Sequence, residues 1–73
     1  MSEDISLKML QRLGRAVKNS RKAKGFSQAR LGVLYDMDKA SICRLEKGKS
    51  NVTISSLNKI AKALNISVSE LLV

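Results

Sequence analysis

Apolar residues recur every three or four positions along most of this 73-residue chain. That spacing predicts amphipathic α-helices, each with one face turned toward a core. No stretch alternates apolar and polar residues for long enough to predict a strand, so we expect an all-α fold of five helices. The apolar stripes are Leu10, Leu13 and Val17 in a helix at about 6–24; Leu31 and Tyr35 in a helix at 28–35; Ile42 and Leu45 in a helix at 39–47; Leu57, Ile60, Ala61 and Leu64 in a fourth helix; and Leu71 in a fifth.

The predicted helix ends are marked by residues that tolerate a left-handed backbone. Gly25, Asp36, Gly48 and Asn65 each follow the last turn of a predicted helix, where that conformation is common. Start signals agree, because Ser, Thr and Asp side chains accept hydrogen bonds from the free amides of a first turn. The expected caps are Ser27, Asp38, Thr53 and Ser67, the last of which forms a capping box with Glu70.

The charge of the chain points to a polyanionic partner. Fourteen Lys and Arg residues against six acidic residues give a net charge of +8. Lys and Arg that contact phosphates release condensed counterions, so such a balance favours nucleic-acid binding. Phe26 and Tyr35 are the only aromatic residues. Two aromatics are too few to favour single-strand binding by base stacking.

Several other functions are disfavoured by composition. Cys43 is the only cysteine, so the chain has no internal disulfide, which suits a reducing cytoplasm. The absence of histidine excludes a Cys/His zinc site and a Cys–His nucleophile. The carboxylates form no spaced acid pair, and we expect no enzyme, no metal and no cofactor. The acidic start and the lack of a long apolar run argue against a secretion signal or a membrane span, so we expect a cytoplasmic protein.

The segment 28–48 predicts two short helices joined by a tight turn. Such a pair can place its second helix in the major groove of duplex DNA while the first braces it. Ile42 and Leu45 must face the core, so the opposite side of the second helix is free for DNA. Gly32 lies where the two helices would cross, which explains a residue that otherwise weakens a helix by about 1 kcal/mol.

From about Leu13 to Leu72 the chain resembles the Cro/phage-repressor class of helix-turn-helix proteins, also called the XRE class. The resemblance implies one compact domain over residues 1–73, in which the second and third helices form the DNA-binding motif. Residues 1–11 extend the first helix and are not covered. The compact form also resembles the controllers of restriction–modification systems and the DNA-binding antitoxins. The matching residues are Leu13-Gly14, Val17, Arg21, 25–28, Leu31-Gly32, Ile42, 44–49, Leu57, Ile60-Ala61, Leu64, Ile66 and Glu70-Leu71.

The resemblance implies which residues contact DNA. Arg44 is the strongest candidate for base contacts, because its guanidinium fork can bind guanine O6 and N7 together. The full base-contacting set is Lys39, Ala40, Ser41 and Arg44; the phosphate-contacting set is Ser27, Gln28, Lys47, Lys49, Ser50 and Asn51. Arg21 and Glu46 match a partly buried ion pair of the family and are expected to be structural.

Two features depart from the family pattern. Asp36 stands at the turn where the family usually has glycine, although Asp also tolerates the left-handed conformation. Val33 and Leu34 occupy positions that are normally polar. We expect Leu34 to widen the core stripe; the alternative is that both residues contact the N-terminal extension or a partner.

We therefore expect a transcriptional regulator that binds a palindromic site on double-stranded DNA as a homodimer. One module contacts few base pairs, whereas two modules on a palindrome contact enough to find a site. The apolar residues of the fourth and fifth helices are numerous for so small a core, so those helices are the expected dimer surface. Two alternatives stay open. The first is a non-specific basic nucleic-acid binder, and the second is a protein-interaction module such as an antitoxin.

Overall fold

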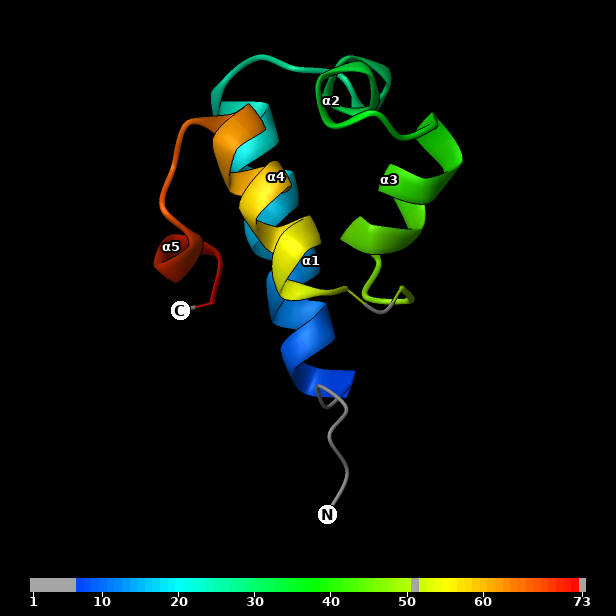
Figure 1. The fold of residues 1–73 in the computed structure, drawn as a ribbon. Helices are drawn as coiled ribbons and strands as arrows, with labels where there is room; N and C mark the ends of the chain where they lie inside the picture. Colours follow the sequence, from blue (N-terminus) through cyan, green and yellow to red (C-terminus); the bar gives the residue numbers. More distant parts are fainter. Residues whose placement is uncertain (1–6, 51, 73) are drawn as a thin grey trace.

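The computed structural model describes residues 7–50 and 52–72, and within them it contains helices and turns only. The predicted all-α fold of five helices is confirmed. In Figure 1, α4 runs alongside α1, α5 lies on one side of this pair, and α2 and α3 lie on the other side and above. In the described part of the chain no helix has the length and apolarity to cross a membrane. The helices are α1 (Leu7–Ala23), α2 (Gln28–Tyr35), α3 (Lys39–Glu46), α4 (Ile54–Leu64) and α5 (Val68–Leu72).

The helix ends follow from local backbone chemistry, as predicted. Gly25, Asp36, Gly48 and Asn65 all have a positive φ, between 57° and 75°. Each of these residues therefore turns the chain out of a helix. The start signals are also confirmed, since the side chains of Ser27, Asp38 and Thr53 accept amide hydrogens of the first turns of α2, α3 and α4. At α5 the Glu70 amide donates to Ser67 Oγ at 3.4 Å.

One core unites all five helices. Val17 of α1, Leu31 of α2 and Ile42 of α3 have no exposed surface. They meet residues of α4 and α5 that were expected to serve partly as a dimer surface. Those residues, Leu57, Ile60, Leu64 and Leu71, are at most 1% exposed. They belong to the core of the single chain, so any contact between two chains through α4 and α5 must use other side chains.

α1 and α3 approach each other closely at Gly14. A Cβ atom at this position would lie 2.6 Å from the Leu45 carbonyl oxygen, nearer than real Cβ atoms come to such a group. Glycine therefore lets the backbones of α1 and α3 meet. This close approach holds the inner side of α3 against the core.

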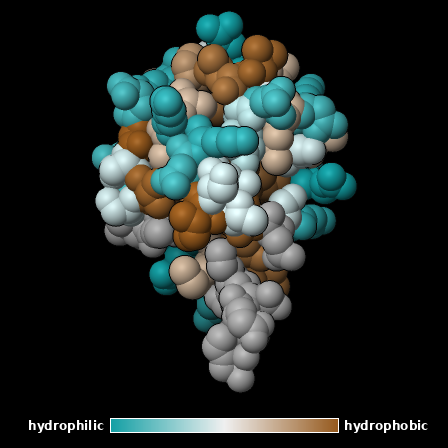
Figure 2. Space-filling model, viewed as in Figure 1, coloured by the Kyte–Doolittle hydropathy of each residue, from teal (hydrophilic) through white to brown (hydrophobic). Residues whose placement is uncertain are grey.

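The prediction that Leu34 widens the core stripe of α2 is wrong. Leu34 is 43% exposed and Val33 is 75% exposed. The stripe of α2 is completed by Leu31 and Tyr35, which lie one turn apart, and Leu34 falls beside it. The alternative contact with the N-terminal extension would involve Ile5, Leu7 and Met9. Ile5 lies outside the described residues, whereas Leu7 and Met9 are 64% and 45% exposed at the end of α1 that is remote from α2 in Figure 1. Figure 2 shows brown side chains at the upper end of the molecule, where α2 lies in Figure 1.

Candidate nucleic-acid interface

The turn between α2 and α3 is fixed by Asp36. This residue adopts φ 64° and ψ 44°, and its amide hydrogen points back to the carbonyls of Gly32 and Val33. The next amide, that of Met37, donates to the Gly32 carbonyl at 2.7 Å. A Cβ atom on Gly32 would collide with the Met37 carbonyl oxygen. Gly32 is thus required by the turn itself, and the crossing of the two helices is set there.

The start of α3 is fixed by Asp38. Its Oδ1 accepts the Ser41 amide hydrogen at 3.0 Å. Hydrogen bonds from the Ser41 side chain and amide lower the pKa of the Asp38 carboxyl, and the positive charge of Arg44 contributes a smaller attraction. Asp38 therefore acts as the cap that the sequence predicts, and it ties the half-buried Ser41 to the first turn of α3.

The outer face of α3 is open to solvent. Ile42 and Leu45 are 0% and 2% exposed on the inner side. Lys39, Ala40 and Arg44 are exposed on the outer side. None of these three side chains makes a hydrogen bond within residues 7–50 and 52–72. The structure therefore presents two cations and one methyl group on a short rigid helix, with Ser41 at the edge of the same face.

A buried ion pair joins α1 to the end of α3. Arg21 Nε lies 2.6 Å from Glu46 Oε2, and Arg21 Nη2 donates to Glu46 Oε1 at 3.1 Å. Arg21 Nη1 donates to the Phe26 carbonyl at 2.8 Å, which also ties down the loop before α2. The side chains of the two ions are 9% and 3% exposed. All three nitrogens of the guanidinium group therefore donate, as a buried charge requires.

The two groups of expected phosphate contacts lie at neighbouring positions. Gln28 Nε2 donates to Glu46 Oε1 at 3.0 Å, so the first turn of α2 contacts the last turn of α3. Ser27 Oγ accepts the Arg30 amide hydrogen at 3.0 Å and is exposed. The free amides of this first turn carry partial positive charge, which attracts a phosphate. Lys47 follows Glu46 directly, and its side chain is exposed.

The loop after α3 turns back toward α1. Gly48 has φ +74°, and the Lys49 amide donates to the Arg44 carbonyl at 3.0 Å. A Cβ atom on Gly48 would lie 2.8 Å from Gln11 Cα, so the loop is pressed against α1. Lys47 and Lys49 are exposed and Ser50 is half-buried. Asn51, the last member of the expected phosphate set, lies outside the described residues.

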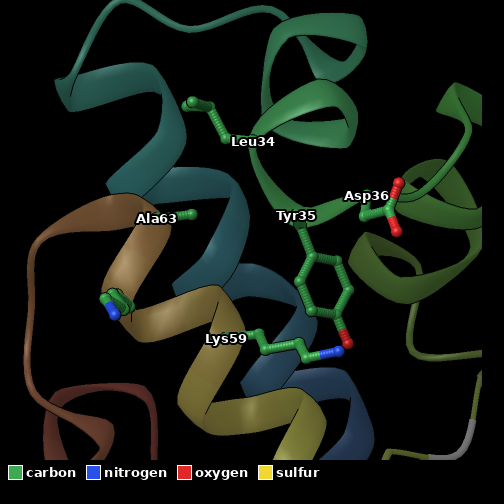
Figure 3. A pocket seen from close by; sticks show the side chains of 6 residues that line it. Leu34, Tyr35, Asp36, Lys59 and Ala63 are labelled. Carbon is green, nitrogen blue, oxygen red and sulfur yellow. The ribbon is translucent and has the colours of Figure 1, made fainter.

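A hollow of about 450 Å³ lies between the end of α2 and the middle of α4. Figure 3 shows Lys59 extended beside the Tyr35 ring, so that its ammonium group and the tyrosine hydroxyl lie at the same edge. Asp36 is the one carboxylate of the lining, which has neither a thiol nor a histidine. Among residues 7–50 and 52–72 no three His, Cys, Asp or Glu gather as metal ligands. The lining residues are Leu34, Tyr35, Asp36, Lys59, Lys62 and Ala63.

Sequence reasoning missed two contacts that hold the interface together. One is the hydrogen bond between Gln28 and Glu46, which depends on two helices meeting in space. The other is the requirement for glycine at Gly14, where the neighbouring backbone belongs to a residue more than thirty positions away. A signal for the first existed, because Gln28 and Glu46 both belong to the family pattern. Their mutual contact is not encoded in either position alone.

Comparison with known proteins identifies relatives along most of the chain. The family described as "Helix-turn-helix" matches residues 17–71. The control protein C.MunI from a Mycoplasma species is 38% identical over 61 residues, which are 82% of this chain and 82% of that protein. The competence pilus inhibition repressor of Acinetobacter baylyi is 37% identical over 59 residues, which are 81% of this chain. The aligned part is 54% of that repressor, so this chain spans about half of its length.

A solved structure has the same arrangement of helices. The restriction–modification controller protein C.AhdI from Aeromonas hydrophila superimposes with a TM-score of 0.81 at 35% sequence identity. The match covers 85% of this chain and 94% of the controller. The helices of this chain, α3 among them, are therefore arranged as in a known controller protein.

Proposed function

This chain belongs to the helix-turn-helix family of XRE-type transcriptional regulators, and we propose that it binds a palindromic operator on double-stranded DNA as a homodimer, with α3 in the major groove. The outer face of α3 carries this proposal. Its inner residues are buried, its exposed Lys39 and Arg44 make no hydrogen bond or ion pair within the described residues, and the expected phosphate-contacting residues of α2 and of the loop after α3 lie beside it.

Each residue of the expected site has a distinct part in the proposal. Arg44 donates two hydrogen bonds to a guanine, and Lys39 contacts a neighbouring base as a point charge. Ala40 packs on a thymine methyl group. Ser41, at the edge of the same face, donates a hydrogen bond to a base or accepts one from it. The amides of Ser27 and Gln28 and the side chains of Lys47, Lys49, Ser50 and Asn51 bind phosphates, which set the register without selecting a sequence.

The homodimer is supported by apolar surface that the core leaves uncovered. Ile54 at the start of α4 is 70% exposed, and Val68 at the start of α5 is half-buried. Figure 2 shows brown side chains over this region of the visible face, between the beginning of α4 and α5. We place the dimer contact there, with Ile54 and Val68 in place of the leucines that the core has taken.

A controller of a restriction–modification system is the subtype we favour. Two matched controllers, C.MunI and C.AhdI, align with this chain over 82% and 94% of their own lengths. Such a protein acts in the cytoplasm, where its DNA is, and it needs neither an enzymatic activity nor a cofactor. A gene for a restriction enzyme or methyltransferase beside the operator would support this subtype.

The experiment that tests the proposed function is selection of bound duplexes from a random DNA library. We expect a palindromic sequence to be enriched. At physiological salt the selected duplex should bind at least about a thousandfold more tightly than a scrambled duplex of the same composition. Equal binding of the two duplexes would contradict sequence-specific recognition and would support a non-specific nucleic-acid binder.

A further inference from the structure

α1 carries a row of polar, mainly basic side chains on the face opposite the core. Successive residues of an α-helix turn by about 100°, so Arg15 lies about 160° around the axis from both Leu13 and Val17. Those two residues are 2% and 0% exposed, whereas Arg15 is exposed. Residues three and four apart from Arg15 therefore point outward with it. The basic row consists of Lys8, Arg12, Arg15, Asn19 and Lys22.

Within the described residues, the positive charge of the basic row forms no stabilising ion pair. The 17 residues of α1 include no Asp or Glu. In the part of the chain that the structure describes, Arg12, Arg15 and Lys22 have no ion-pair partner, and Arg21 is the one cation of α1 with an acidic partner. Like charges three or four residues apart destabilise a helix. A helix that keeps them without internal compensation indicates an external anion.

A shallow hollow in the middle of the row has a lining suited to anion binding. It measures about 330 Å³ and is lined by Arg12, Arg15, Ala16 and Asn19. Two guanidinium groups and one amide surround it, and the small Ala16 leaves it open. Guanidinium groups bind phosphate oxygens with paired N–H donors, and Asn side chains also donate to phosphates.

The basic row is continuous with the phosphate-binding loop of the proposed interface. Gly48 of that loop is pressed against Gln11 of α1. Gln11 lies about 40° around the helix axis from Arg15, so it adjoins the row. The exposed Lys47 and Lys49 flank Gly48. A phosphate backbone that follows this loop away from α3 therefore meets the edge of the row next.

We propose that the basic row of α1 is a second phosphate-binding surface, which binds the duplex DNA that flanks the operator half-site. This inference rests on the proposed function and extends its footprint. The row is about 21 Å long from Lys8 to Lys22, which equals about six base pairs of duplex. It contains no aromatic side chain for base stacking and no large apolar side chain for insertion into lipid. Rigid phosphate backbone is the anion that suits it.

The test compares two duplexes and two charge-matched variants. The short duplex is the selected palindrome alone, and the long duplex adds about 15 base pairs of arbitrary sequence on each side. The variant Arg12→Gln/Arg15→Gln removes two cations from the row. The control Lys59→Gln/Lys62→Gln removes two cations from α4, which line the other hollow. Affinity is measured by fluorescence anisotropy across a salt series.

We expect wild-type protein to bind the long duplex more tightly than the short one, and the Arg12→Gln/Arg15→Gln variant to lose that gain. The salt slope of this variant on the long duplex should be shallower by about 0.9 for each phosphate contact removed. For a dimer that loses four phosphate contacts, the slope should be shallower by about 3 to 4. The control should keep the gain. Glutamine is a good helix former, and removing like charges relieves repulsion, so this variant should melt no lower than wild type.

Three outcomes would overturn the inference. The variant of the row could keep the length-dependent gain, or the α4 control could lose it equally. The row could instead bind vesicles of phosphatidylserine in an Arg12- and Arg15-dependent manner while the gain on long DNA stays intact, which would assign it to a membrane surface.

Failure of the proposed function gives a different result, because wild-type protein would then bind selected and scrambled short duplexes alike. In that case, loss of the length-dependent gain in the row variant would still support a phosphate-binding surface.

Discussion

Gln28 donates from its side-chain amide to Glu46 Oε1 at 3.0 Å, and this oxygen also accepts Arg21 Nη2. One carboxylate thus holds the first turn of α2, the last turn of α3 and the C-terminal part of α1. The residue expected to bind a phosphate is at the same time a support of the motif. We therefore expect DNA affinity and stability to be linked at this position.

We expect Gln28→Ala to lower the free energy of unfolding by about 1–2 kcal/mol, because a half-buried hydrogen bond to a charged group is lost. Urea denaturation measures this. If Gln28 also contacts a phosphate in the complex, Gln28→Ala weakens binding to all duplexes with little change in the salt slope, because a neutral amide displaces no counterion. Unchanged stability with weakened DNA binding would mean that the bond to Glu46 contributes nothing.

Glu46→Ala should cost about 3–5 kcal/mol of folding free energy, because it leaves the Arg21 guanidinium buried without its partner. For a domain of this size such a loss removes much of its stability. The measurement is thermal or urea unfolding. The double variant Arg21→Met/Glu46→Leu, which removes both charges, should recover a large part of the loss. A single variant within about 1 kcal/mol of wild type would refute a structural role for the pair.

Arg44→Ala should weaken binding to the selected operator by about 1–3 kcal/mol and relax the preference at one base position in each half-site. Lys49→Ala should weaken all duplexes to a similar extent and make the salt slope shallower by about one. Competition binding with single-base operator variants separates the two effects. If Arg44→Ala bound every operator variant as wild type does, Arg44 would not be a base-contacting residue.

The pH dependence of stability should include a contribution from Asp38. Its pKa is lowered in the folded state by hydrogen bonds from Ser41, relative to an ordinary value of 3.8. The folded state therefore binds fewer protons than the unfolded state, and this stabilisation is present above about pH 4 and is lost as the pH falls through the lower folded pKa. Asp38→Asn keeps a good cap without the charge. Urea unfolding between pH 6 and 2 should show a smaller acid-side loss for this variant; equal losses would contradict the role of the carboxylate.

Ile54→Lys should shift the chain toward a monomer, because it places a charge in the proposed dimer contact. Ile54 is 70% exposed, so the substitution should leave the stability of the single domain nearly unchanged. Sedimentation over a range of concentrations, with and without operator DNA, measures the association. Wild-type protein that stayed monomeric at micromolar concentration under both conditions would contradict the homodimer.

The helices could be predicted from the sequence because their ends are set by local chemistry. Asp36 and Asn65 adopt the left-handed backbone that short polar side chains tolerate. Asp38 caps α3 through an amide three residues away. Interactions over three or four residues are visible in a linear pattern. The orientation of α3 followed from the same logic, since Ile42 and Leu45 had to face inward.

The errors concern contacts between distant segments. Leu34 is apolar and lies three residues after the buried Leu31, yet it is 43% exposed and lines an open hollow beside α4. Leu57 and Leu64 looked surplus to a small core, but they are 1% and 0% exposed within the single chain. The basic row of α1 is equally visible in the sequence. What the sequence could not supply was the position of the loop at Gly48 beside it, which depends on how α3 and α1 pack.

The separation of inner and outer faces on α3 has a consequence for how such a protein acquires new targets. Ile42 and Leu45 anchor the helix, whereas the exposed side chains of Lys39, Ala40 and Arg44 make no hydrogen bond or ion pair within the described residues. Exchanging those three residues should alter which promoter is recognised at little cost to folding. The DNA sequence that such a protein recognises can therefore change while its fold stays the same.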